Sequence, residues 1–394
     1  MFAHKSNRIW KIPPTIIPQL KKNLDEYFTN NGVWSLNYKL GYVLFEAYYL
    51  TYTNKKDFKR LYENLNICLE SIDVYPYKDA SLFNGISGLG WVLEHFRNIG
   101  VLSQGDIFDT VSQIDALIES ELKGEQVTVH DLDLFYGIVG ITVYLLEKNQ
   151  SRAKSHLLTI AFQKICSTIE LMNESTKIDL GMPHGLSGVI IILTKLLKFG
   201  FDEKLLLKNL SLCSGVILNS RLVSDELSLF PTETTSTKPS RLAWCYGDLS
   251  ILFALARANV HLRSETLNYQ IHLLHQTCQL RKLDKSGVFT SNENIDTGLC
   301  HGSLGIAYVL NKISQATNDS TDGQILYWIE QSFYKMDITK KFLNFKTAYP
   351  EEGGIEWGYD GGLVDGLAGI GLMLIGLSST KCTAWDSLFL LDID

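Results

Sequence analysis

A short glycine motif recurs along this chain, and it constrains the fold more than any other sequence feature. Each copy has a glycine, two intervening residues, and then a second glycine or, in one copy, a serine. Successive copies begin 48 to 64 residues apart, at Gly85, Gly137, Gly185, Gly247, Gly302 and Gly366. Recurrence at this spacing is typical of a closed or stacked array of similar structural units.

Each motif leads into an apolar segment of helical length, such as Val189 to Leu197. The stretches between motifs are amphipathic, and apolar residues in one of them follow the helical period at Leu158, Phe162, Ile165 and Ile169. A unit of two helices explains both patterns, because the glycines let the inner helix begin close to a neighbouring unit.

The chain holds about seven such units. The stretches that open at Ser35 and Ser81 are alike and lie 46 residues apart, which places a degenerate first unit between Lys39 and Leu50. Strand-like alternation is scarce. We therefore predict an all-α fold, an α/α toroid or double-layered helical barrel, with the glycine-rich turns gathered at one end and residues 1–394 in a single domain. An open solenoid of helix pairs is the alternative, but it would keep distant repeats apart.

Composition excludes some classes of function. The 394 residues are 45% hydrophobic, enough for a sizeable core, and 36 basic and 43 acidic side chains give a net charge of −7 without a long basic run. No nucleic-acid partner is expected. No apolar run approaches the roughly 20 residues of a membrane span, and the first 20 residues lack the apolar core of a signal peptide. We expect a cytoplasmic protein without a transmembrane segment. Any association with a membrane would occur through its partner proteins.

Two of the motifs carry residues that bind metals. Cys245 lies two residues before Gly247, and Cys300 and His301 directly precede Gly302. Two thiols and one imidazole suit zinc and leave a fourth position open, as in catalytic zinc sites. Seven cysteines, an odd number, favour thiols or metal ligation over disulfides in an intracellular chain. Four others are expected in the core: Cys68, Cys166, Cys213 and Cys278.

The segments Ser240 to Asp248 and Leu299 to Gly302, in this order within the repeat, resemble the lanthionine synthetase C-like family. This family includes the cyclases of class I lanthipeptide (lantibiotic) biosynthesis. The resemblance implies an α/α toroid with its active site at the glycine-rich end. It also implies that Cys245, Cys300 and His301 are ligands of a Zn²⁺ ion.

The resemblance singles out four further residues as catalytic. His184, with an ordinary pKa near neutrality, is the candidate for accepting the thiol proton or supplying the Cα proton. Asp133 would orient that histidine. Arg241 would hold an enolate oxygen or anchor Asp133, and Tyr246 would donate a hydrogen bond to the same oxygen or pack beside the metal.

The implied reaction closes (methyl)lanthionine thioether rings. A cysteine thiol of a dehydrated precursor peptide, made of leader and core, adds to dehydroalanine or dehydrobutyrine, with a dehydratase and a transporter as partners. Two alternatives stay open: a relative that adds glutathione to dehydroamino residues, and a non-catalytic peptide-binding scaffold. A toroid that acts on glycans would need paired carboxylates, whereas the turns here carry cysteine and histidine.

Other polar residues near the motifs have simpler interpretations. Asp248, Asp296 and Asp365 are expected as helix caps or turn residues. Glu351 and Glu352, which precede Gly353, are expected in a solvated loop, and the stretch from Tyr349 to Gly362 is long enough to border the cavity. Substrate choice is expected in two loops, Ser224 to Ser240 and Thr347 to Gly362. The repeat spacing leaves little room for the small β-rich insertion that some class I cyclases carry.

Overall fold

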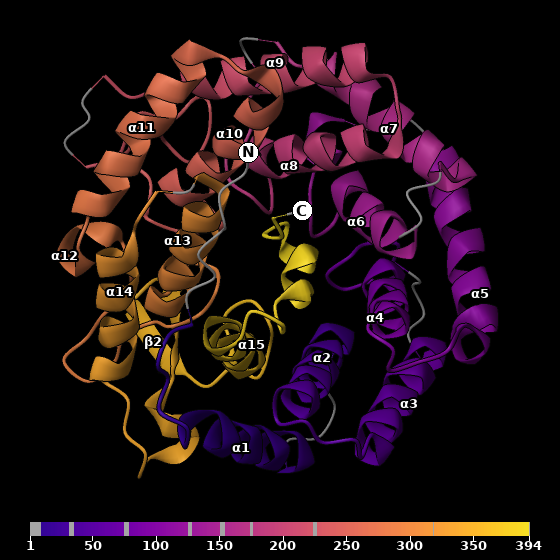
Figure 1. Cartoon of the computed structure of the whole chain (residues 1–394), viewed down its shortest axis with the longest axis vertical. Helices are drawn as coiled ribbons and strands as arrows, with labels where there is room; N and C mark the ends of the chain where they lie inside the picture. Colours follow the sequence, from indigo (N-terminus) through magenta and orange to yellow (C-terminus); the bar gives the residue numbers. More distant parts are fainter. Residues whose placement is uncertain are drawn as a thin grey trace.

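The helices that follow the glycine motifs line the inside of a closed ring (Figure 1). The computed structural model describes residues 9–30, 35–74, 79–124, 128–149, 154–173, 176–223, 227–317 and 319–393. Each inner helix packs on the next, and the last packs on the first. In the described part of the chain these inner helices are α2 (Leu36–Tyr52), α4 (Ile86–Asn98), α6 (Ile138–Lys148), α8 (Leu186–Leu196), α10 (Asp248–Leu262), α13 (Ser303–Thr317) and α15 (Leu367–Ser378).

A second layer of helices surrounds the first. Within the same described ranges it comprises α1 (Ile16–Asn30), α3 (Lys59–Val74), α5 (Gln104–Lys123), α7 (His156–Ile169), α9 (Glu203–Asn219), α11 (Glu265–Leu280) and α14 (Asp322–Tyr334). Shorter elements are η1 (Val129–Asp131), η2 (Leu197–Phe199), α12 (Leu283–Ser286), η3 (Lys341–Asn344), η4 (Ala384–Phe389), β1 (Thr347–Glu351) and β2 (Gly354–Gly358). The predicted all-α toroid of about seven helix pairs is confirmed, and the degenerate first unit is α2.

Burial follows the two layers. The inner helix α8 is buried at every residue except Lys195, as its continuous apolar sequence requires. The outer helix α7 buries one stripe, in which Leu158, Phe162, Ile165 and Ile169 are all buried. Each such side chain contributes about 1.5–3 kcal/mol when fully removed from water. This difference in burial explains why α7 shows an amphipathic period in the sequence, whereas α8 is apolar along almost its whole length.

The motif glycines are needed because each turn closes tightly on itself. A Cβ atom on Gly185 would lie 1.9 Å from the carbonyl oxygen of Asp179, and one on Gly247 would lie 1.9 Å from that of Arg241. Both glycines have extended backbones, so the space around them, and not a left-handed conformation, is what excludes a side chain.

Backbone hydrogen bonds join each glycine turn to the next. In each bond, an N–H two or three residues before one motif glycine donates to the carbonyl two residues before the following motif glycine. The donor and acceptor pairs are Phe83 and Phe135 (3.0 Å), Leu134 and Pro183 (2.6 Å), Met182 and Cys245 (3.1 Å), Trp244 and Cys300 (3.1 Å), Cys245 and Cys300 (3.1 Å), Leu299 and Val364 (2.8 Å), and Cys300 and Val364 (3.1 Å). The turns therefore gather at one end of the ring, as predicted.

The C-terminal segment lies inside the ring, where η4 occupies the centre (Figure 1). The indole N–H of Trp244 donates to the carbonyl of Phe389 (3.2 Å), and the two rings meet edge to face. The hydroxyl of Tyr308 donates to Asp386 (2.7 Å), which also pairs with Lys312. The centre of the toroid is thus filled by the chain itself, an arrangement that the repeat pattern did not predict.

The solvated loop expected at Glu351 and Glu352 is the exposed tip of an antiparallel hairpin of β1 and β2, and the two strands were not predicted. Five residue pairs join the strands, from Thr347 with Gly358 at the open end to Glu351 with Gly354 at the turn. Aromatic and β-branched residues that alternate with others in these strands favour this structure. The two acidic residues at the turn are exposed.

In the ranges that the structure describes, no helix combines the length and the apolar character that crossing a membrane requires. Residues 1–8, part of the segment tested above for a signal peptide, lie outside those ranges. Residues 224–226, at the start of the first loop expected to select substrates, also lie outside them.

Because neighbouring turns approach closely, a side chain at Gly181 should strongly reduce the stability of the fold. An added Cβ atom there would lie 1.7 Å from the carbonyl oxygen of Cys245. We expect Gly181→Ala to lower the free energy of unfolding by about 2 kcal/mol or more, because the turns must separate. Gly215 lies inside α9 with open space around it. Gly215→Ala should instead raise stability by about 0.5–1 kcal/mol through helix propensity. Equal urea midpoints for the two variants would contradict the account.

Candidate metal centre

The two cysteines and the histidine singled out above come together at the glycine-rich end. One possible ligand atom from each of Cys245, Cys300 and His301 lies within 4.8 Å of the other two. Cys245 and Cys300 each stand two residues before a motif glycine, the position that joins successive turns. The backbone N–H of Cys245 donates to the carbonyl of Cys300, which places their side chains next to each other. Residues 55 positions apart in sequence thus meet because their repeats are adjacent in the ring.

The buried carboxylate of Asp296 and the half-buried carboxylate of Asp365 flank the imidazole of His301. Asp296 Oδ2 lies 3.5 Å from Nε2, and Asp365 Oδ1 lies 3.8 Å from Nδ1. A metal-ligating histidine usually directs its other nitrogen at a carboxylate or carbonyl, and this site offers a carboxylate on either side. Asp296 also accepts hydrogen bonds from the backbone N–H groups of Gly298 (2.9 Å) and Ala348 (3.2 Å), so its position is fixed.

The sequence analysis assigned Asp296 and Asp365 only to caps or turns and missed their contact with His301. A signal was present in the repeat. Asp365 stands directly before its motif glycine, as do His184, Tyr246 and His301 in earlier repeats. Reading every repeat at this position would have identified Asp365 as a residue of the site.

The charges of the cluster are strongly coupled. The hydrogen bond from the Cys300 thiol lowers the pKa of Cys245 despite burial, and His301 lowers it further. The same bond and burial raise the pKa of Cys300, so the two sulfurs share a proton. Burial lowers the pKa of His301, but Asp296 and Cys245 outweigh this effect and raise it to about 10. Burial raises the pKa of Asp365 to about 7, although His301 lowers it.

The residues present fit a zinc ion. Two sulfurs and an imidazole nitrogen are the ligands that zinc prefers, and three protein ligands leave one position for a water or a substrate. Within the described residues, Nε2 of His301 and Oδ1 of Asp365 are buried and lack a hydrogen-bond partner. Buried polar atoms rarely remain unpaired without a functional reason. Cys245, Cys300 and His301 could therefore hold the ion.

A histidine and aspartate pair lies beside the cluster. His184 Nδ1 and Asp133 Oδ2 are 2.6 Å apart, and the other Asp133 oxygen accepts the backbone N–H groups of Phe135 (2.7 Å) and Tyr136 (2.8 Å). The turn therefore orients the carboxylate, which orients the imidazole. Burial lowers the pKa of His184, but the hydrogen bond and charge of Asp133 outweigh burial and raise it. Arg241 is not needed to anchor Asp133 in this arrangement.

Aromatic rings hold His184 in place. Tyr246 stacks on the imidazole with ring centroids 5.6 Å apart, and Tyr136 stacks on it at 6.4 Å. Since Tyr246 directly follows Cys245, this contact links the pair to the cluster. Burial and the nearby Asp179 raise the pKa of Tyr246, so its hydroxyl remains a donor at neutral pH. The sequence analysis did not select Tyr136 or Asp179.

A polar cavity of about 300 Å³ opens beside this pair. His130, Lys177 and Asp179 line it together with His184 and Tyr246. The cavity gives solvent protons access to the imidazole.

Arg241 occupies the base of the turn that carries Cys245. Its guanidinium lies over the ring of Phe289, 4.3 Å from the centroid, and Phe289 in turn meets His301 edge to face at 5.6 Å. The arginine thus reaches the cluster through one aromatic ring. Asp248, in contrast, is fully buried and pairs with Arg281 (3.1 Å), as expected of a structural residue.

Fold and site together define an α/α toroid with a candidate thiol–imidazole metal centre at its glycine-rich end. A family model described as "Lanthionine synthetase C-like protein" matches residues 40–390, and the chain belongs to this family. Among 14 matching chains of solved structures is nisin cyclase, with a TM-score of 0.73 and 17% sequence identity over 96% of this chain and 98% of that chain. This likeness shows the shared fold. No curated relative matches the chain by sequence.

The cluster predicts the metal content of the purified protein. We expect about one zinc per chain in the wild type and almost none in Cys300→Ala, because two protein ligands hold zinc poorly. Cys278→Ala is the matched control, since this buried cysteine lies in α11 outside the cluster, and it should retain zinc. Elemental analysis of the three proteins, with circular dichroism to verify folding, decides the point. Equal zinc in all three would refute the three-ligand site.

The Asp133 contact predicts a shift in the titration of His184. We expect Asp133→Asn to lower the pKa of His184, because the carboxylate that favours imidazolium is lost while an amide oxygen can still accept the backbone N–H groups. Histidine-selective NMR titration measures this pKa. An unchanged value would show that the 2.6 Å contact does not control protonation.

The same pair should also make stability depend on pH. Because folding raises the pKa of His184 above 6.5, the pair stabilises fully below about pH 6.5 and loses this contribution as pH rises through the folded pKa. Asp133→Asn should therefore cost more unfolding free energy near pH 5.5 than near pH 9.

Proposed function

We propose that this chain is a zinc-dependent peptide cyclase that adds cysteine thiols of a precursor peptide to dehydroalanine or dehydrobutyrine, closing (methyl)lanthionine rings. The observation that carries the proposal is the placement of two functional groups at one end of the ring. The Cys245, Cys300 and His301 cluster and the His184 and Asp133 pair are joined there through Tyr246. Membership of the lanthionine synthetase C-like family supports the same reaction.

The first chemical problem is that a free cysteine thiol has a pKa of about 8.5, so little of the reactive thiolate exists at neutral pH. Zinc, when bound, would deprotonate a coordinated thiol of the substrate and keep it nucleophilic. With zinc bound, the protein would supply two thiolates and a neutral imidazole around that position, so the donor set itself would carry two negative charges. This electron-rich environment keeps the substrate sulfur reactive.

The second problem is the movement of the proton. The sulfur forms a bond to Cβ, the π electrons of the double bond move toward the carbonyl oxygen as an enolate, and Cα then takes a proton. Asp133 accepts from Nδ1 of His184, which leaves Nε2 to take up the thiol proton and deliver it to Cα. The proton lost by sulfur is the proton gained by carbon, so the addition balances without another reactant.

The third problem is the negative charge of the enolate. The neutral hydroxyl of Tyr246, which is next to Cys245 in sequence and stacks on His184, would donate a hydrogen bond to the enolate oxygen. Arg241, held against Phe289, adds a permanent positive charge on the side of His301. Fixed donors and charges of this kind act where negative charge develops.

The proposal places the enzyme in the cytoplasm, after a dehydratase and before export. Its substrate is a precursor of leader and core whose serine and threonine side chains have been dehydrated. A partner dehydratase and a transporter are the proteins with which it would assemble.

The acid and base role of His184 is tested by substitution. With a dehydrated peptide that carries one cysteine, we expect His184→Asn to lower kcat about 10²- to 10⁴-fold. Zinc content should not change, because the ligands remain. His130→Asn is the control, since His130 lines the same polar cavity without an Asp133 contact, and it should retain activity. Ring closure is measured by mass spectrometry after alkylation of free thiols. Full activity of His184→Asn would exclude the role.

Adding glutathione to the same assay distinguishes ring closure within the peptide from addition of a thiol from solution. Ring closure in the presence of millimolar glutathione, without a glutathione adduct, supports the cyclase. Preferential adduct formation would instead assign the chain to thiol addition from solution. Zinc binding without either product would leave a peptide-binding scaffold.

A further inference from the structure

An apolar chamber of about 280 Å³ lies at the glycine-rich end, next to the candidate metal centre. Its walls come from the glycine turns, the inner helices and the C-terminal segment. They include Leu82, Phe83, Val92, Phe135, Leu363 and Phe389. Pockets that bind whole small molecules usually measure about 300–1,000 Å³. The chamber is therefore sized for part of a larger ligand, such as one side chain of a peptide.

The chamber touches both halves of the proposed site. Asp365 lines the chamber and lies 3.8 Å from His301, and Val364, also in its wall, accepts the backbone N–H of Cys300 (3.1 Å). On the other side, the ring of Phe135 meets that of His184 edge to face at 5.4 Å. A peptide that reacts between the cluster and His184 therefore has a neighbouring side chain within reach of the chamber.

The wall of the chamber carries two carboxyl groups. The carboxylate of Asp360 is fixed there by the hydroxyls of Tyr38 (2.8 Å) and Tyr349 (3.1 Å). Asp365 adds a second carboxyl group, and no lysine or arginine is among the residues that line the chamber. An acidic side chain would enter against this charge and would lose its water, so the chamber favours apolar residues over acidic ones.

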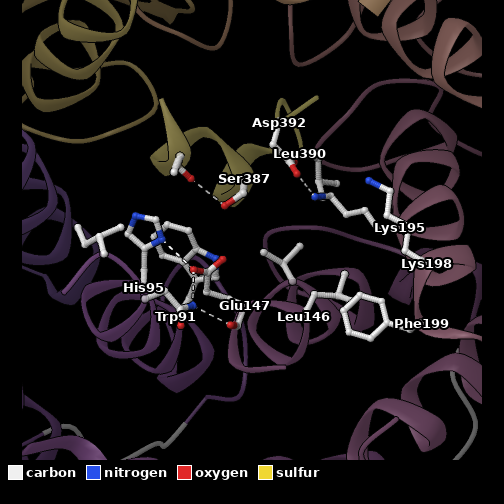
Figure 2. Close-up of a pocket in the computed structure, with 14 residues that line it drawn as sticks. Trp91, His95, Leu146, Glu147, Lys195, Lys198, Phe199, Ser387, Leu390 and Asp392 are labelled. Atoms are coloured by element: carbon white, nitrogen blue, oxygen red, sulfur yellow. Dashed lines mark hydrogen bonds and ion pairs between the residues drawn. The ribbon is translucent and has the colours of Figure 1, made fainter. Parts of the chain in front are cut away.

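A second cavity, of about 310 Å³, is similar in size but differs in its position and in its charged lining (Figure 2). It lies at the C-terminal ends of α4, α6 and α8, away from the glycine turns where these helices begin. Figure 2 shows Lys195 paired with Asp392 on one side and His95 paired with Glu147 on the other. The residues that line this charged cavity include no member of the cluster or of the His184 and Asp133 pair, so it serves as a reference site for substitutions.

We propose that the apolar chamber selects substrates by taking an aromatic or branched aliphatic side chain next to the reacting residues of the peptide. This inference rests on the proposed peptide cyclase. The C-terminal segment takes part in selection, because Phe389 forms one wall and its carbonyl accepts the indole N–H of Trp244, the neighbour of Cys245. The chamber thus lies between the C-terminal segment at the centre of the ring and the candidate metal centre.

The test uses peptides that bind but cannot react. Alanine replaces the dehydro residue, and the residue beside it, on each side in turn, is alanine, phenylalanine or glutamate. Titration calorimetry with the zinc-loaded protein measures Kd. At one of the two positions we expect phenylalanine to bind about tenfold tighter than alanine, and glutamate to bind more weakly than alanine. Equal Kd values for the three peptides at both positions would overturn the proposal.

Two matched variants locate the effect. Val92→Phe fills the chamber and should abolish the preference for phenylalanine, whereas Val143→Phe places the same change in the charged cavity and should keep it. If Val92→Phe does not fold, Leu363→Ala enlarges the chamber and should shift the preference from phenylalanine toward tryptophan. A preference for phenylalanine that survives Val92→Phe in the folded protein, or that Leu363→Ala leaves unchanged, would place selection elsewhere and overturn the proposal.

Peptide binding and ring closure are measured separately, so the proposed side-chain site and the proposed cyclase activity can each fail without the other. Selective binding without any ring closure, in the assay with dehydrated peptide, would contradict the cyclase and retain a peptide side-chain site. Ring closure with no difference between phenylalanine and alanine peptides would retain the cyclase and remove the chamber as its selectivity site.

Discussion

The backbone hydrogen bonds between successive glycine turns are the constraint on which the rest of this structure depends. They require neighbouring turns to approach until backbone meets backbone, which is possible only where side chains are absent, as the contact of Gly181 with the Cys245 carbonyl shows. Once the turns are joined, the inner helices all begin at the same end of the ring and are parallel to one another. The outer helices then cover the apolar surface that remains.

Because of this arrangement, residues at the same position of different repeats lie at the same end of the ring. The residues one and two places before each motif glycine face the same end of the ring. A cysteine stands two places before the motif glycine only at two neighbouring turns, as Cys245 followed by Tyr246 and as Cys300 followed by His301. The proposed metal centre therefore needs no special backbone, because the scaffold that stabilises the ring also brings its ligands together. His184 occupies the equivalent place one turn earlier, which explains its contact with Tyr246.

The repeats predicted the toroid, its seven units and the end at which the site lies, because these follow from spacing and apolar period. They did not predict features that depend on contacts outside the repeat. The entry of Phe389 into the centre of the ring depends on the shape left by the inner helices, and the flanking of His301 by Asp296 depends on how one turn folds back on itself. The hairpin of β1 and β2 was hidden by its glycines and glutamates, which resemble a loop when only composition is considered.

We propose that the joined turns create a metal site with a free position for a substrate thiol. X-ray absorption spectroscopy at the zinc edge tests it most directly, on the zinc-loaded protein before and after addition of a peptide with one free cysteine. The account predicts two sulfurs at about 2.3 Å with nitrogen or oxygen ligands at about 2.0–2.2 Å, and three sulfurs after the peptide is added. A sulfur count that stays at two with saturating peptide, or zinc without sulfur ligands, would contradict it.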